Sequence, residues 1–311
     1  MFSHGLQQSH MSLLNHLGSA IAAQKQNQYD TRNEYLQKAH QAHPTASIAI
    51  GLTTARLQIE EHQWESALAN LQQLHSAVPQ NNEICKLLIE VAAELNDWDI
   101  VLAHTTALRK NNLFPAKVTH EFMQKAYAAH LDKLIDHTKH EITEKNIKEQ
   151  KNKIDTFWKK LSDDWHQDPV LLTRYIAYLQ SNGRIEEAET LLKNALKHHW
   201  DPRLIHSYAQ LRTPDLDSQI KVAEKWLKQH PDDPDLLYIL GALTYRQKLW
   251  GKARQYLQHS LDIKAAAKTY YLLAQVFVGM QDIDRANATY EKGLRLAADN
   301  NSTLLTGDPA K

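Results

Sequence analysis

The sequence predicts an all-α protein built from repeated helix pairs, an α-solenoid. Only 9 Gly and 9 Pro occur in 311 residues, and this scarcity of turn formers disfavours a turn-rich β protein. Leu, Ala, Gln, Lys and Glu, which are good helix formers, dominate the composition. A pattern of apolar and small residues also recurs along the chain, as expected for stacked copies of one helical unit.

The repeat begins with a large apolar residue, followed three positions later by a small or β-branched one. Clear copies begin at Trp64, Trp98, Ile185, Trp250 and Ile283, and an imperfect copy at Tyr29. The small residues Ala67 and Val101 are 34 residues apart, and Ala253 and Ala286 are 33 apart. Tetratricopeptide repeats have about 34 residues, whereas armadillo-type units have over ~40. The ankyrin signature Thr-Pro-Leu-His is absent, so the spacing predicts a tetratricopeptide-like superhelix.

A second small residue precedes the first by twelve positions in four copies, at Ala20, Ala55, Gly241 and Ala274. Two antiparallel helices joined by a short turn cross closely, and a bulky side chain at the crossing would hold them apart. The tryptophans at the start of the second helices, Trp64, Trp98 and Trp250, recur at one place in the repeat. We therefore expect them to cover the helix pairs, and not to form a ligand site.

The repeat loses its register once, because Val101 and Ala188 are 87 residues apart. We expect a long, irregular helical insert there, and a polar segment at each end of the chain. The predicted organisation is a flexible N-terminus over 1–11, N-terminal repeats over 12–113, the irregular long-helix segment over 114–165, C-terminal repeats over 166–297 and a disordered tail over 298–311.

Charge and composition exclude several classes of function. Acidic and basic residues balance at 36 each, so the chain has no general attraction for nucleic acid. No stretch of 18 apolar residues occurs that could span a membrane. The single cysteine, Cys85, lies in a helical pattern and is expected to be a packed structural thiol. The Lys-rich run from Lys139 to Lys160 is interleaved with acidic residues and reads as a solvated, salt-bridged face.

Four segments, in their order along the chain, carry a family resemblance. They are Trp158-Lys159-Lys160-Leu161 leading to Asp168-Pro169, Lys197-His198-His199-Trp200-Asp201, Ala223-Glu224-Lys225-Trp226-Leu227 followed by His230-Pro231-Asp232-Asp233-Pro234, and Leu249-Trp250-Gly251-Lys252-Ala253-Arg254. Together they resemble the bacterial HemY-type tetratricopeptide-repeat proteins linked to late haem biosynthesis. The resemblance implies anchoring to the bacterial inner membrane, with the helical domain on the cytoplasmic side. That family carries two N-terminal membrane helices that this sequence lacks, so we expect a shortened or divergent member.

No enzyme motif is present. The sequence has no Walker-type loop, no Gly-x-Ser-x-Gly, no His-Glu-x-x-His and no dinucleotide-binding Gly-x-Gly-x-x-Gly. His137 and His140 with Glu141 could hold a metal from one helix face, but a solvated face is the simpler interpretation. Adjacent residues on a helix point about 100° apart, so His198 and His199 cannot share one axial haem site. We therefore expect no enzyme, no metal and no catalytic residue.

The groove lined by the first helix of each pair is the better candidate for function. Tyr and Arg there suit recognition because they offer large contact area and forked hydrogen bonding, although packing between repeats is the alternative. Counted from the small crossing residues, and with the degenerate unit over 201–233 kept in register, the groove candidates are Arg56, Lys86, Glu90, Tyr208, Arg212, Tyr238, Tyr245, Arg246, Tyr271 and Gln275.

The sequence and the resemblance together predict a protein-interaction scaffold. It would organise late haem-biosynthesis enzymes as protein partners at the inner membrane, with membrane contact only through an anchor absent from this chain. A tetrapyrrole-binding protein, with haem or porphyrin as ligand, is one alternative. A general tetratricopeptide adaptor unrelated to haem is another.

Overall fold

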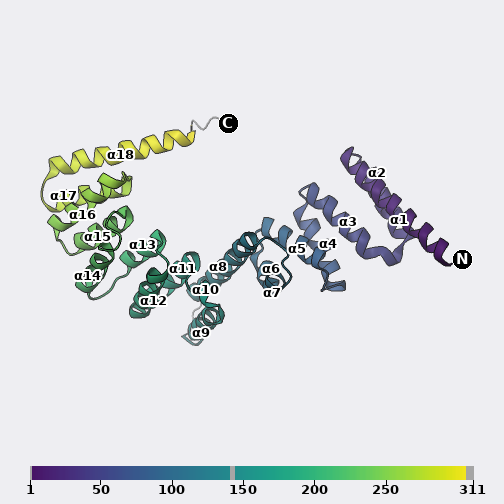
Figure 1. The fold of residues 1–311 in the computed structure, drawn as a ribbon, viewed down its shortest axis with the longest axis horizontal. Helices are drawn as coiled ribbons and strands as arrows, with labels where there is room; N and C mark the ends of the chain where they lie inside the picture. The colour runs from purple at the N-terminus through teal and green to yellow at the C-terminus, as the bar shows by residue number, and fades with distance from the viewer. Residues whose placement is uncertain (1, 141–143, 306–311) are drawn as a thin grey trace. The chain divides into compact units, whose positions relative to one another are not determined.

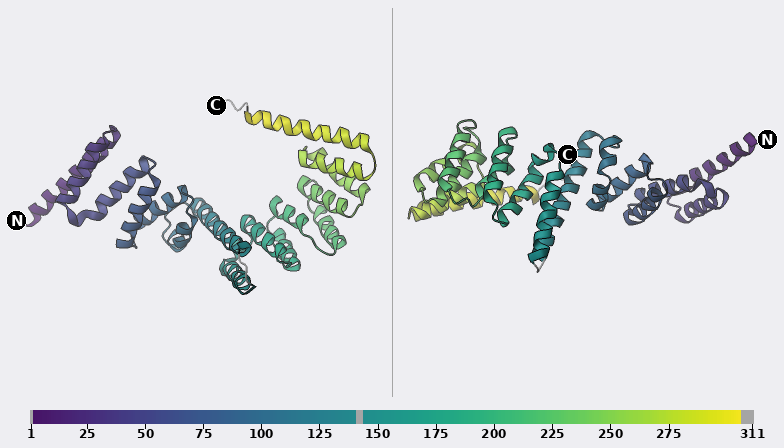
Figure 2. Two further views of the ribbon diagram at one scale, coloured as in Figure 1. Left: turned by 180° about the vertical axis from the view of Figure 1, so that it is seen from behind. Right: turned by 90° about the horizontal axis from the view of Figure 1, so that it is seen from below.

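The computed structural model describes residues 2–140 and 144–305. The described residues form helices joined by short turns, with no strand among them, which confirms the predicted all-α helical-repeat fold. No helix in these two ranges combines the length and the apolar character needed to cross a lipid bilayer. Successive helices run antiparallel as pairs that stack along the chain (Figure 1; Figure 2).

The chain forms two compact units, residues 1–134 and 135–311. Unit 1 holds the first three helix pairs, in which the third pair has a broken second helix. Its elements are α1 (Phe2–Lys25), α2 (Tyr29–Ala42), the short 3₁₀ helix η1 (Pro44–Ala46), α3 (Ser47–Glu60), α4 (Trp64–Ala77), α5 (Asn82–Glu94), α6 (Trp98–Ala103), α7 (Thr105–Lys110) and most of α8 (Ala116–His140).

Unit 2 holds four regular helix pairs, preceded by helices of unequal length. Its elements are the end of α8, then α9 (Glu144–Lys160), α10 (Asp163–His166), α11 (Pro169–Ser181), α12 (Ile185–His198), α13 (Pro202–Gln210), α14 (Leu216–Leu227), α15 (Pro234–Arg246), α16 (Trp250–Ile263), α17 (Ala267–Gly279) and α18 (Ile283–Leu305). The segment 114–165 contains α8 and α9, whose 25 and 17 residues exceed the 14 residues of a regular second helix such as α16.

The turn inside most pairs repeats one backbone geometry. A residue with positive φ ends the first helix, and the next residue donates its N–H back across the turn, as Leu249 does to the Thr244 carbonyl at 2.9 Å. This is the hydrogen bonding of a Schellman cap, which satisfies carbonyls that the helix end leaves open. The positive-φ residues of these turns are Asn27, His62, Asn96, Gly183, Lys248 and Gln281. The identical turns set the antiparallel geometry of each pair.

The predicted crossing residues lie where the helices of a pair approach most closely. Ala20, Ala55 and Ala274 are completely buried. A Cβ atom added to Gly241 would lie 2.5 Å from two atoms of the Leu257 side chain. No side chain larger than hydrogen therefore fits at Gly241 without displacing Leu257, which confirms the predicted close crossing.

Alanines and leucines of the second helices fill the core between the crossing points. In unit 1, Ala67, Leu71 and Leu74 of α4 pack with Ala55 and Leu88. Unit 2 repeats the arrangement with Ala253 and Leu257 of α16. The tryptophans Trp64 and Trp250 are partly buried against these clusters, as expected of residues that cover a helix pair. Cys85 is buried, and burial raises the pKa of its thiol, which suits a packed structural residue.

The described parts of both chain ends are helical. The segment expected to be flexible, 1–11, is helical from residue 2, because α1 begins at Phe2. The expected disordered tail, 298–311, is helical to Leu305, where α18 ends. The helix continues because no Pro lies between Ile283 and Leu305, and the next breakers are Gly307 and Pro309. Residues 306–311 lie outside the described part.

Candidate functional site

The first helices of the pairs lie on the inner side of unit 2. α13 contacts both α11 and α15, and α15 also contacts α17. The second helices α12, α14, α16 and α18 make no more than marginal contact with one another within the described residues. A stack whose first helices touch while its second helices diverge is curved, with the first helices on the concave side. We call this side the inner face.

Side chains spaced at helical intervals form a stripe along the inner face. Asp235, Tyr238 and Tyr245 occupy one side of α15, and Lys268, Tyr271 and Gln275 occupy the matching side of α17. Positions three and seven apart share a helix face, so each set points in one direction. His206 of α13 extends the stripe onto a third helix, because it lies against both Asp235 and Tyr238.

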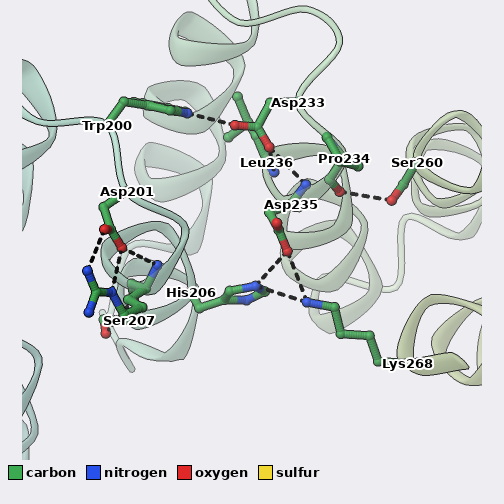
Figure 3. A network of polar contacts seen from close by, with 11 residues as sticks. Trp200, Asp201, His206, Ser207, Asp233, Pro234, Asp235, Leu236, Ser260 and Lys268 are labelled. Atoms are coloured by element: carbon green, nitrogen blue, oxygen red, sulfur yellow. Dashed lines mark hydrogen bonds and ion pairs between the residues drawn. The ribbon is translucent and has the colours of Figure 1, made fainter. Parts of the chain in front are cut away.

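One carboxylate connects three helices at one end of the stripe (Figure 3). Lys268 Nζ donates to Asp235 Oδ1 at 3.0 Å, and His206 Nε2 lies 2.8 Å from the same oxygen. The Lys268 ammonium also lies 4.8 Å from the centre of the Tyr238 ring, within range of a cation–π interaction. Burial opposes ionisation of Asp235, but the hydrogen bonds from Lys268 and His206 outweigh it and lower the pKa of this carboxyl.

A hydrogen-bonded row of polar groups continues the stripe. The Tyr245 hydroxyl donates to Gln275 Oε1 at 3.0 Å, and Gln275 Nε2 donates to the Tyr271 hydroxyl at 3.0 Å. The Tyr245 ring also meets Trp250 edge-on at 5.4 Å, which ties it to the core. Tyr271 instead is 59% exposed, so its ring is available for contact with another molecule.

Two arginines lie near the C-terminal end of α13. Arg246 Nη1 donates to the Ala209 carbonyl at 3.1 Å, which satisfies a helix-end acceptor. Burial and then the charge of neighbouring Arg212 lower the pKa of Arg246. Arg212 itself is exposed, in the turn after α13. The two like charges give this part of unit 2 a positive potential that an acidic group would relieve.

The prediction of Tyr208 as a groove residue is wrong. Tyr208 is completely buried, with its ring against Trp226 and its hydroxyl donating to Glu189 Oε1 at 3.2 Å. The cause is the register of α13, which begins at Pro202 and has only nine residues. That register turns Tyr208 toward α12 and α14, and places His206 on the inner face.

The groove candidates of unit 1 form ion pairs. Arg56 Nη2 lies 2.8 Å from Glu83 Oε1, which joins α3 to α5, and both side chains are about half exposed. Lys86 and Glu90 pair along α5 at 4.0 Å. Lys86 also lies 5.8 Å from the centre of the Phe114 ring. Burial raises the pKa of Glu90. Arg56, Lys86 and Glu90 therefore take part in surface ion pairs, and each such pair adds little to the stability of the fold.

The sites considered for metal or haem gain no support from the geometry. Within the described ranges, no group of three or more His, Cys, Asp or Glu side chains is arranged to hold a metal ion. Glu141 lies outside the described residues, so the His137–His140–Glu141 group, for which the sequence favours a solvated face, is not described as a whole. His198 and His199 are exposed, and α12 ends between them.

The sequence reasoning missed the centre of the network, because His206, Asp235 and Lys268 were not among the groove candidates. A signal existed in the Asp-Pro dipeptides that begin α11, α13 and α15. Asp168, Asp201 and Asp233 accept hydrogen bonds from the first N–H groups of these helices, as N-cap residues do. Alignment on these caps, instead of on the small residues, makes His206 equivalent to Tyr238 and Tyr208 equivalent to the buried Leu240, which is the observed register of α13.

The comparisons with known proteins agree with the sequence. No family model matches the chain. Protein HemY of Escherichia coli strain K12 is 21% identical over 289 residues, which cover 93% of this chain and 70% of that protein; Protein HemY of Shigella flexneri matches equally. A tetratricopeptide repeat protein from Parabacteroides merdae ATCC 43184 superposes with a TM-score of 0.37 at 13% identity, covering 92% of this chain and 93% of that one. MamA MSR-1 gives 0.36 at 15% identity, covering 57% and 98%. The chain is therefore similar to the HemY proteins over almost its whole length, and its resemblance to HemY-type tetratricopeptide-repeat proteins is confirmed.

Proposed function

We propose that the chain is a protein-interaction scaffold whose inner face in unit 2 binds a protein partner. The observation that supports this proposal is the stripe of Tyr, His, Asp, Lys and Gln side chains over α13, α15 and α17, together with the two arginines near the C-terminal end of α13. Tyrosine and arginine are the residues that most often dominate binding energy at protein interfaces. Hydrogen bonds between neighbouring helices hold most of these side chains in place, so binding orders few additional torsions.

The chemistry of the stripe favours a partner that presents acidic and apolar side chains together. Arg212 and Arg246 form a positive pair at one end, where a carboxylate would be attracted. The ring of Tyr271 offers an exposed apolar surface. Lys268 is already paired with Asp235, so we assign it to ordering the face and not to contacting the partner.

The similarity to HemY proteins leads us to propose enzymes of late haem biosynthesis as the partners, at the cytoplasmic side of the bacterial inner membrane. The scaffold needs no catalytic residue and no cofactor of its own. A titration with haem or protoporphyrin tests the tetrapyrrole alternative, and we expect no saturable change in the Soret band. Saturable binding would replace the scaffold with a tetrapyrrole carrier.

The test measures capture of purified late haem-biosynthesis enzymes from the same cells by the immobilised chain. The variant Tyr271→Ala with Arg212→Ala removes two exposed inner-face groups, and we expect it to weaken capture at least about tenfold. The matched control, Gln255→Ala with Lys292→Ala, removes exposed side chains of second helices. Equal capture by both double variants would exclude the inner face of unit 2 as the binding surface.

A further inference from the structure

A groove separates the first two helix pairs, between α2 and α3. It has a volume of about 570 Å³, within the range of about 300–1,000 Å³ usual for ligand sites. Its lining comes from two helices: Asn33, Leu36, Gln37, His40 and Gln41 of α2, and Ile50 and Thr54 of α3. The groove lies in unit 1, and it is distinct from the inner face that we propose as the partner site.

The corresponding junction between the second and third pairs is filled. There, Leu68 and Leu71 of α4 pack against Ile84 and Leu88 of α5 in one hydrophobic cluster. The repeat length of about 34 residues identifies the equivalent positions at the first junction. The two junctions can therefore be compared residue by residue.

Two polar replacements open the first junction. Asn33 stands where the next repeat has Leu68, and Thr54 stands where it has Leu88. Leu36 and Ile50 keep the apolar character of their counterparts and lie at the groove. The junction that should hold a leucine core is therefore an open channel with an apolar floor and polar walls.

The three amide side chains form a ladder along α2. Asn33, Gln37 and Gln41 are four residues apart, so they share one face of the helix with a spacing of about 6.0 Å. An extended peptide repeats every two residues, at about 6.6–6.8 Å. Successive amides therefore lie close to register with every second peptide group of an extended chain.

We propose that this groove binds an extended peptide segment of a partner protein, with an apolar side chain inserted over Leu36 and Ile50. A carboxamide both donates and accepts, so it can pair with the N–H and C=O of one peptide group. The Oδ1 atom of Asn33 accepts a hydrogen bond from Arg32 Nε at 3.0 Å, which orients its Nδ2 group as a donor. Among the described residues, the groove lining contains one histidine, His40, and no Lys, Arg, Asp or Glu, so the bound segment needs no charge where it lies.

The probes are capped nonapeptides of alternating Ser and Thr with a variable central residue, measured by fluorescence anisotropy on the full chain. We expect the members with central Leu, Ile or Val to bind and the member with central Ser to fail. Backbone N-methylation of alternate residues then tests the ladder. Two peptides are compared, one N-methylated at the odd-numbered residues and one at the even-numbered residues. The peptide whose methylated groups face the ladder should bind about tenfold or more weakly, and the other should bind nearly as well as the unmethylated peptide. Equal effects of the two sets, or no binding by any member, would overturn the proposal.

Three variants connect binding to the groove. Gln37→Ala with Gln41→Ala should weaken the apolar-centred peptides about tenfold. Thr54→Leu restores the leucine found at the next junction, so it should close the groove, abolish binding and not lower the melting temperature. The control Gln72→Ala removes the equivalent exposed amide of α4 and should bind normally. Peptide binding that survives Thr54→Leu would contradict the assignment.

The two proposals fail separately. Tyr271→Ala with Arg212→Ala leaves unit 1 unchanged, so the peptide probes should bind that variant as tightly as the unmodified chain. Capture of haem-pathway enzymes by the inner face should in turn be insensitive to Gln37→Ala with Gln41→Ala. Loss of peptide binding in the unit 2 variant would place the peptide site on the inner face and remove the groove proposal.

Discussion

At the scale of single residues, the closest contacts of the fold are made by glycines at helix crossings. A Cβ atom on Gly241 would lie 2.5 Å from Leu257 Cγ, and one on Gly51 would lie 2.7 Å from Leu74 Cδ2. Real Cβ atoms do not approach so closely, so a methyl group at either position must displace a buried leucine. Gly251 differs, because nothing lies within 4 Å of its Cβ position.

Gly241→Ala should destabilise the protein although alanine is the better helix former. The gain in helix propensity is about 1 kcal/mol, whereas overpacking a core costs about 1–3 kcal/mol. We expect a net loss near 1–2 kcal/mol in urea denaturation followed by circular dichroism. Gly251→Ala, the matched control, should gain up to about 1 kcal/mol. A melting temperature unchanged by Gly241→Ala would disprove the close crossing.

Also at the residue scale, burial and a contact between two histidines of unit 1 lower the pKa of one of them. His75 Nε2 lies 3.2 Å from His104 Nε2, and His104 Nδ1 lies 2.7 Å from the Ile100 carbonyl. His104 therefore donates through Nδ1 and accepts through Nε2, which leaves His75 Nδ1 unprotonated. That atom is buried, and no described residue offers it a hydrogen bond. Burial and then the interaction with His104 lower the pKa of His75.

The lowered pKa of His75 predicts a loss of stability in mild acid. In the unfolded chain the His75 side chain binds a proton at about pH 6.5. In the folded protein the same side chain binds the proton only at lower pH. The free energy of unfolding should therefore fall as the pH drops from 6.5 toward the folded pKa. His75→Asn should flatten this dependence in denaturation series between pH 7.5 and 5.5. The control His40→Asn changes the exposed histidine at the equivalent position of α2 and should leave the pH dependence unchanged. Equal flattening by both variants would refute the assignment of the pH dependence to His75.

At the scale of elements, Asp-Pro caps fix where α11, α13 and α15 of unit 2 begin. Asp233 accepts from the backbone N–H groups of Asp235 and Leu236 at 2.9 and 3.0 Å. Its other oxygen accepts from Trp200 Nε1 at 2.6 Å, so one carboxylate caps α15 and joins it to the short segment between α12 and α13 (Figure 3). The cap at Asp233 therefore sets both the start of α15 and its junction with the preceding chain segment.

Asp233→Ala should lower the free energy of unfolding by about 2 kcal/mol, because it removes an N-cap and a charge-assisted hydrogen bond. Its neighbour Asp232 is a matched control. The Asp232 side chain is 80% exposed, and its Oδ1 atom makes a long contact of 4.0 Å with His259 Nε2. Asp232→Ala should change stability by less than about 0.5 kcal/mol. Chemical denaturation followed by circular dichroism measures both, and similar losses would show that the cap has no special role.

The caps also show which part of the inner face could be predicted. Tyr238, Tyr245, Tyr271 and Gln275 lie together on it, because their helices keep the regular repeat length. Tyr208 does not, because α13 has nine residues and its pairing depends on Asp201 and Pro202 at its start. In a degenerate repeat the helix still forms, but it can be rotated about its own axis relative to the helices of the regular repeats. This rotation decides which of its side chains reach the surface.

At the scale of the whole molecule, the main helix contacts among the described residues of each unit lie within a helix pair or between pairs that are adjacent along the chain. Stability in such a protein is a sum over repeats and their junctions, and it does not rest on one shared core. Destabilisation should therefore remain near its source. The division into units 1–134 and 135–311 makes this expectation measurable.

Hydrogen exchange in Gly241→Ala tests this locality. Amide protection should fall in α14 to α17, which surround the substituted position, and stay unchanged in α3 to α5 of unit 1. Mass spectrometry of peptic fragments resolves these regions in one experiment. Matching losses of protection in both units would mean that the chain unfolds as one cooperative body.

The sequence alone determined the periodic features of this protein. The repeat length, the small crossing residues such as Ala55 and Gly241, and the covering tryptophans follow from contacts inside one helix pair, which recur whenever the pair recurs. The tertiary structure decided what happens between pairs: the burial of Tyr208, the Asp235 network and the open junction at Asn33 and Thr54. These depend on how far neighbouring helices rotate and separate to fill volume, and helical periodicity in one segment does not contain that information.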